Sequence, residues 1–155
     1  MSRSETERDI IETLGQVPDF FKDMPDETLA REWAQWKEFQ MTDTAISARE
    51  KQLIGFAVAA AIHCPYCTYF HQSATKMMGT TREQLEEAAR MAADTAKYST
   101  YLHGLQIPIE DFKKQSDEMG EYVAAHQPGT TGEATTVEAA TGRVEETLAD
   151  LREAS

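Results

Sequence analysis

Apolar residues recur at intervals of three and four along most of the chain, which is the spacing of one face of an α-helix. The alternation of apolar and polar residues that marks a half-buried strand is absent from the sequence. Alanine, glutamate, leucine and methionine dominate the periodic segments, and all four favour helices. The sequence therefore predicts an all-α fold.

Two helices are predicted in the first forty residues. The first covers about residues 5–14 and ends at Gly15, and the second runs from Asp26 to Gln40. The segment QVPDFFKDMPDE between them is expected to be a loop. We expect the apolar side chains of this region to form a core, and these are Val17, Phe20, Phe21, Leu29, Trp33, Trp36 and Phe39.

The middle of the chain carries two helix-start signals. Ser47 and Glu50 form a Ser-x-x-Glu capping box, which opens the segment KQLIGFAVAAAIH. Because this segment is apolar on nearly all sides, it predicts a buried central helix. Thr80 and Glu83 form a second box before REQLEEAARMAADTAKYSTYL, where another helix is expected.

The C-terminal part of the chain is more polar. An amphipathic helix is expected from about Glu110 to His126, followed by a linker, QPGTTGEATT. The last segment, VEAATGRVEETLADLREAS, has a thin apolar stripe and predicts a marginal helix. We therefore divide the chain into a helical domain, 1–126, and an acidic linker with a marginal C-terminal helix, 127–155.

The segment HCPYCTYFH holds both cysteines and two of the four histidines. Pro65 suits the first turn of a helix, which places Cys64 at the helix start, and Gly79 closes this helix. At about 100° per residue, Cys64, Cys67 and His71 fall on one face. The helix N-terminus favours a thiolate, and an imidazole one turn away can take up the proton.

Two thiols and a base on one face suffice for a thiol peroxidase or a disulfide reductase. An inert buried cysteine pair remains an alternative. A zinc site would need His63 or His103 to complete four ligands, and we expect neither a metal nor another cofactor. The motif Cys-Pro-Tyr-Cys also occurs in glutaredoxins, but that fold requires a strand before the motif, and here a helix is predicted.

The segment LIGFAVAAAIHCPYCTYFHQSATKMMGTTREQLEEA resembles the AhpD-like branch of the carboxymuconolactone decarboxylase superfamily. The resemblance implies an AhpD-like helical fold that assembles as a trimer or hexamer, with alkylhydroperoxidase or disulfide reductase activity. It also implies that Cys67 forms a sulfenic acid, that Cys64 donates a proton and closes the disulfide, and that His71 belongs to the proton relay.

Two positions depart from the family pattern. Gln52 stands where the family usually has a glutamate, and Tyr66 stands where some members have a histidine. An amide can orient a neighbour but cannot accept and return a proton as a carboxylate does. Glu50 is assigned to the capping box. We therefore expect weaker peroxidase turnover than in the best-studied branch, or action mainly on disulfides.

Charge and hydropathy limit the partners. The chain has 27 acidic and 15 basic residues, and its net charge of −12 would repel nucleic acids and anionic membrane surfaces. The longest apolar stretch, 53–62, is too short to span a membrane, and the polar N-terminus lacks the features of a signal peptide. We therefore expect a cytoplasmic protein.

The functional hypothesis is an antioxidant peroxidase that reduces hydroperoxides through a redox-active cysteine pair and is itself reduced by an external dithiol. Homo-oligomerisation is expected because an apolar central helix is best buried between subunits. The alternatives are a carboxymuconolactone decarboxylase-type enzyme, a protein disulfide reductase, and a non-catalytic metal-binding or scaffold module.

Overall fold

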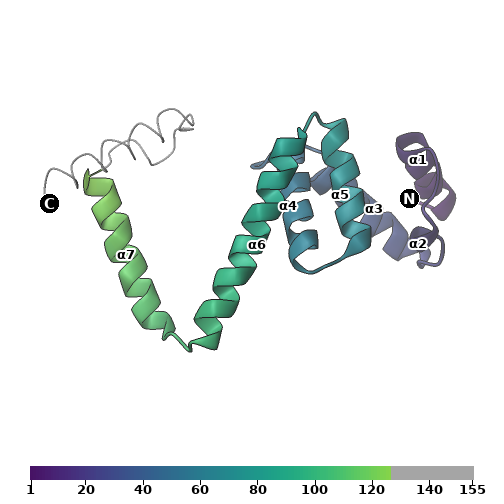
Figure 1. The fold of residues 1–155 in the computed structure, drawn as a ribbon. Coiled ribbons are helices and arrows are strands. Elements are labelled where there is room, and N and C mark those ends of the chain that lie inside the picture. Colours follow the sequence, from purple (N-terminus) through teal and green to yellow (C-terminus); the bar gives the residue numbers. More distant parts are fainter. Residues whose placement is uncertain (127–155) are drawn as a thin grey trace, which may run out of the picture. The chain divides into compact units, whose positions relative to one another are not determined.

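The computed structural model describes residues 1–126, which are mostly helical and contain no strand (Figure 1). The predicted linker and marginal C-terminal helix lie outside the described residues. In chain order the described helices are α1 (Arg3–Leu14), α2 (Asp19–Lys22), α3 (Asp26–Gln40), α4 (Ala48–Ala61), α5 (Pro65–Met77), α6 (Arg82–Gly104) and α7 (Ile109–His126). The all-α prediction is confirmed.

The chain divides into two compact units, one covering Met1–Tyr101 and one beginning at Leu102. In the first unit, α1 packs against α3, α3 packs against α4, and α4 packs closely against α5. Figure 1 shows α4 and α5 running side by side. This antiparallel pair carries the cysteine motif at the turn that joins its two helices.

Local signals determine the ends of α1. The Ser2 hydroxyl accepts from the Glu5 backbone N–H, and the Glu5 carboxylate accepts from the Ser2 N–H at 2.7 Å. This capping box starts the helix at Arg3, two residues before the predicted start. Gly15 ends it with a φ of 82°, a left-handed conformation that glycine adopts without strain.

A small core joins α1, α2 and α3. It consists of Ile10, Phe21, Leu29 and Trp33, with Val17, Met24 and Trp36 packed against it. The predicted loop between α1 and α3 contains the short helix α2. Phe20 and Phe39 were expected in this core, but both are exposed, so that expectation is wrong for them. Their neighbours, Phe21 on α2 and Trp33 on α3, occupy the interior instead.

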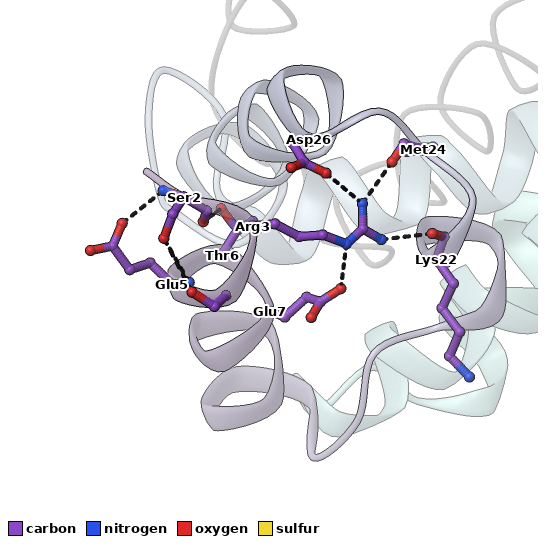
Figure 2. Close-up of polar contacts among 9 residues, drawn as sticks. Ser2, Arg3, Glu5, Thr6, Glu7, Lys22, Met24 and Asp26 are labelled. Atoms are coloured by element: carbon purple, nitrogen blue, oxygen red, sulfur yellow. Dashed lines mark hydrogen bonds and ion pairs between the residues drawn. The ribbon is translucent and has the colours of Figure 1, made fainter.

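Arg3 links α1 to the segment between α2 and α3 through hydrogen bonds and ion pairs (Figure 2). Its guanidinium donates to the backbone carbonyls of Lys22 at 2.6 Å and Met24 at 2.9 Å. It also pairs with the carboxylates of Glu7 at 2.8 Å and Asp26 at 2.9 Å. The planar, five-donor guanidinium is suited to holding several acceptors at fixed angles. Arg3 therefore fixes the backbone of the segment that contains Met24.

The predicted capping boxes have different outcomes. Glu50 accepts from the Ser47 backbone N–H at 3.0 Å and caps α4 as expected, which confirms its structural assignment. At α6 the capping pair is Thr81 and Gln84 rather than Thr80 and Glu83. Two adjacent threonines offer the same local chemistry, and the chain uses the second one.

The prediction that α4 is buried on all sides is wrong for the single chain. Ile54, Val58 and Ile62 are each more than half exposed. The buried side of the helix carries Gln52, Phe56 and Ala59. An apolar stripe of α4 therefore faces outward in the isolated subunit.

In the second unit, α7 begins at Ile109 and none of its residues is buried. Its basic C-terminal residue is His126, whose Nδ1 lies 2.9 Å from the Tyr122 carbonyl, as expected of a histidine that caps a helix end.

The length and hydropathy of the helices bear on membrane insertion. Among residues 1–126, no helix combines the length and the apolar character that a membrane span requires.

Candidate active site

The turn between α4 and α5 places Cys64 at a helix start. His63 has a φ of 57°, in the left-handed region, and this reverses the chain after Ile62. Cys64 is the N-cap residue of α5, and Pro65 occupies the first turn. The predicted position of Cys64, and the end of α5 near Gly79 with its φ of 78°, are confirmed.

The two thiols are free and are coupled through the first turn of α5. The Cys67 backbone N–H donates to the Cys64 sulfur at 3.4 Å, and this hydrogen bond lowers the pKa of Cys64. The pKa of Cys67 is raised, first because its thiol donates to the Cys64 sulfur and second because of burial. Cys64 is therefore the more acidic thiol, and Cys67 is the more exposed one.

His71 on α5 is held by Gln52 on α4. The distance from His71 Nδ1 to Gln52 Oε1 is 2.7 Å, and Gln52 Nε2 donates to the Gln40 backbone carbonyl at 3.2 Å. A carbonyl only accepts, so the Gln52 amide nitrogen must face Gln40 and its oxygen must face the imidazole. His71 Nδ1 therefore carries the hydrogen, and Nε2 keeps its lone pair.

Burial lowers the pKa of His71, which favours the neutral ring. The ring packs onto Gly55 of α4, where a Cβ atom would lie only 2.5 Å from Cε1, 2.6 Å from Nε2 and 2.8 Å from Nδ1. Phe70 contacts the ring edge-on, with centroids 5.1 Å apart. The imidazole is thus a positioned neutral base at neutral pH.

Cys67 and His71 line a cavity of about 440 Å³, while Cys64 does not line it. The cavity wall is mostly apolar and is made by residues of α1, α2, α3, α5 and the segments beside α2. Its aromatic and methionine side chains are Phe20, Phe21, Met24, Trp36, Tyr66 and Phe70. The sequence placed all three candidate residues on one helix face, but only Cys67 and His71 line the cavity. Cys64 lies beside them and accepts the hydrogen bond from the Cys67 backbone N–H.

Comparison with known proteins identifies the family. Residues 27–110 match the family model described as the carboxymuconolactone decarboxylase family, and this is more than half of the chain. The chain belongs to that family. The match includes α3, α4, α5 and α6, and therefore both cysteines, His71 and Gln52.

Two relatives of this carboxymuconolactone decarboxylase family member add detail. The crystal structure of the alkylhydroperoxidase AhpD core from Rhodospirillum rubrum aligns with a TM-score of 0.60 and 26% identity, over 68% of this chain and 80% of that chain. A protein from Paracoccus denitrificans, described as uncharacterized protein 4 in cox locus, is 39% identical over 61 residues. That match covers 39% of this chain and 55% of the relative, so the chain spans about half the length of the curated relative it matches. The structural likeness supports the AhpD-like assignment within the family.

Several residues of the site escaped sequence reasoning. Gly55 carries no functional group, and its close contact with His71 exists only because α5 packs on α4. Trp36 was assigned to the core but also lines the cavity, as does the exposed Glu32 one turn earlier on α3. A glycine inside an apolar helix is a usable signal, because it marks a close approach by another group.

Metal ions in proteins are held by sets of converging ligand side chains. Among residues 1–126 no group of three or more histidine, cysteine, aspartate or glutamate side chains is arranged to hold a metal ion.

Proposed function

We propose that this protein is a thiol-dependent peroxidase that reduces hydroperoxides through Cys64 and Cys67. One observation carries the proposal: Cys67 and a neutral, positioned His71 line one apolar cavity, and Cys64 is hydrogen-bonded to the Cys67 backbone. The AhpD-like fold, shared with the R. rubrum alkylhydroperoxidase core, supports the same activity.

In the proposed cycle, Cys67 attacks the terminal oxygen of a hydroperoxide ROOH while His71 Nε2 takes the thiol proton. The O–O bond breaks, Cys67 becomes a sulfenic acid, and the proton leaves with the alcohol ROH. Cys64 then attacks the sulfenic sulfur, which releases water and forms the Cys64–Cys67 disulfide. An external dithiol of the cytoplasm reduces this disulfide and is itself oxidised.

The raised pKa of Cys67 explains why the proposal needs His71 as a base. At neutral pH Cys67 is a thiol, and thiolates rather than thiols attack peroxides. Gln52 cannot relay the proton further, but it fixes the ring tautomer so that Nε2 is the acceptor. The proton therefore passes from Cys67 to His71 and on to the leaving alkoxide.

The test is hydroperoxide consumption with excess dithiothreitol as the reductant. Cys67→Ser should reduce turnover to the uncatalysed rate, because no sulfenic acid can form on the serine. Cys64→Ser should retain a slower reaction, because the external thiol must then resolve the sulfenic acid directly. Thr68→Ser, on the same helix but outside the cavity lining, serves as the matched control with full turnover. Wild-type turnover in Cys67→Ser would overturn the proposal.

A second candidate, disulfide reductase activity, is favoured by the lowered pKa of Cys64. In that reaction the Cys64 thiolate attacks a disulfide RSSR, which forms a mixed disulfide and releases one thiolate. Cys67 then displaces the second thiolate, so the substrate is reduced and the cysteine pair is oxidised. Cys67→Ser should trap the mixed disulfide on Cys64, which mass spectrometry would detect. A mixed disulfide trapped on Cys67 in a Cys64→Ser variant, with none trapped on Cys64 in Cys67→Ser, would reject this order of attack.

A decarboxylase reaction on a lactone acid is separated from both thiol reactions by alkylation of the protein. Iodoacetamide would abolish hydroperoxide and disulfide reduction but leave a cysteine-independent decarboxylase active.

We also propose that the protein acts as a homo-oligomer, a trimer or a hexamer. The outward stripe of Ile54, Val58 and Ile62 on α4 and the unburied α7 support this, because apolar faces of this size are stabilised by burial between subunits. Light scattering should give three or six times the 17.4 kDa chain mass, and a monomer or a dimer at micromolar concentration would contradict the proposal.

A further inference from the structure

The cavity beside Cys67 has an uneven distribution of charge. Its lining is apolar over most of its surface, and neither lysine nor arginine is among the residues that form it. Glu32 of α3 supplies the one carboxylate among these lining residues. A volume of about 440 Å³ lies within the range of about 300–1,000 Å³ that is usual for small-molecule sites.

Glu32 has only a weak ion-pair partner. Its side chain is 46% exposed, and its ion-pair partner, Arg31, approaches only to 3.8 Å with a side chain that is 70% exposed. Such exposed pairs interact weakly and are screened by salt. The carboxylate is therefore a weakly compensated negative charge in the cavity wall, and the net charge of the chain, −12, has the same sign.

From these features we infer that the cavity binds neutral, apolar hydroperoxides and that Glu32 selects against substrates that carry a carboxylate. The inference rests on the proposed function, because it specifies the substrate class of that same site. An apolar substituent is removed from water by Phe20, Trp36 and Phe70, whereas an anionic substituent finds no cation there and is repelled by Glu32. Glu32 is thus a specificity-determining residue.

The size of the selection follows from the exposure of Glu32. Two unit charges several ångströms apart in a largely aqueous environment repel each other enough for a discrimination of about 3- to 10-fold. We expect kcat/KM for cumene hydroperoxide to exceed that for its para-carboxylate analogue by more than this ratio, since the carboxylate must also be desolvated. Hydrogen peroxide, which has no apolar group, should be a poorer substrate than cumene hydroperoxide.

The experiment measures kcat/KM for the two matched hydroperoxides with the wild-type chain, Glu32→Gln and Glu38→Gln. Glu38 lies on the same helix, is exposed and does not line this cavity, so it controls for the loss of one negative charge. Glu32→Gln should raise the ratio of kcat/KM for the carboxylate analogue to kcat/KM for cumene hydroperoxide about 3- to 10-fold. Glu38→Gln should leave that ratio unchanged. Equal improvement in both variants would assign the selection to net charge and overturn the role of Glu32.

A binding measurement separates this inference from the proposed function. Trp36 lines the cavity, so quenching of its fluorescence reports occupancy by the unreactive alcohols that correspond to the two hydroperoxides. If the neutral alcohol binds and its carboxylate analogue binds more weakly in a Glu32-dependent way, the charge selection holds even if no hydroperoxide is consumed. Equal binding of both alcohols, with or without turnover, would refute the selection.

Discussion

Gly55→Ala is the sharpest test of the way α4 positions the base on α5. The substitution adds one methyl group and removes no functional group. In the native arrangement that methyl carbon would lie 2.5–2.8 Å from three atoms of the His71 ring. Carbon atoms pack at about 3.5–4.0 Å, so the ring must move by about 1 Å. Phe70 contacts the ring as well, which restricts the directions in which it can move.

A displacement of this size has separate consequences for activity and stability. The hydrogen bond of 2.7 Å between His71 Nδ1 and Gln52 Oε1 would be stretched or broken. Misplacing a catalytic group by about 1 Å costs about 100-fold in rate, so we expect kcat/KM to fall by about that factor. Overpacking costs about 1–3 kcal/mol, and the higher helix propensity of alanine returns about 1 kcal/mol. The free energy of unfolding should therefore fall by only about 0–2 kcal/mol, and the variant should fold.

The assay combines hydroperoxide turnover with chemical denaturation followed by circular dichroism. Gly120→Ala is the matched control, since this helical glycine has no atom within 4 Å of an added Cβ. This variant should retain full turnover, and its free energy of unfolding should rise by about 0.5–1 kcal/mol. A folded Gly55→Ala protein with wild-type kcat/KM would refute the role assigned to the His71 position.

Three further predictions concern His71 and its surroundings. Gln52→Glu should raise the His71 pKa by about 1 unit or more, which proton NMR would measure, because a carboxylate favours the charged imidazole. The acidic limb of the pH–rate profile should then move to higher pH. An unchanged His71 pKa would contradict the contact. Because burial lowers the His71 pKa in the fold, the unfolded chain takes up the proton first, so the unfolding free energy should fall as pH drops below about 6.5. His71→Ala should remove that slope, measured by urea titration at several pH values, and a persistent slope would place its origin elsewhere. His63→Gly should stabilise the fold by about 0.5–1 kcal/mol without loss of turnover, because φ is 57° there; lower turnover would instead give His63 a catalytic role.

Helix ends were predictable because their signals are local. Ser47 with Glu50, Pro65 after Cys64, and Gly79 each determine the backbone within a few residues of themselves. The same locality explains the error at α6, where the adjacent Thr80 and Thr81 carry equivalent capping chemistry. A preference of one threonine over the other depends on the exact path of the preceding turn.

Burial was less predictable because it depends on which helices meet. Phe20 and Phe21 have nearly the same local sequence, yet only Phe21 reaches the core. The apolar α4 reads as a buried helix, but in the single chain α3 and α5 cover only part of it. The residue pattern indicates that the apolar side chains of α4 need to be buried, but it does not indicate which helix or subunit covers them.

The candidate residues of the site could be proposed from the sequence, but the contacts that hold them could not. The spacing of Cys64, Cys67 and His71 in the sequence is enough to predict that they share one face at the start of α5. The hydrogen bond from His71 to Gln52 and the contact with Gly55 require α4 and α5 to be packed, and these contacts fix the base. Glu32 lines the cavity from a third helix, α3, so no local sequence pattern connects it with the cysteine motif.

A titration of free thiols in the wild-type chain during addition of cumene hydroperoxide tests the cysteine pair itself. We expect one equivalent to remove both thiols, yield one equivalent of alcohol, and leave a Cys64–Cys67 disulfide that dithiothreitol reverses. If both thiols survive an excess of hydroperoxide, the cysteine pair is not the redox centre.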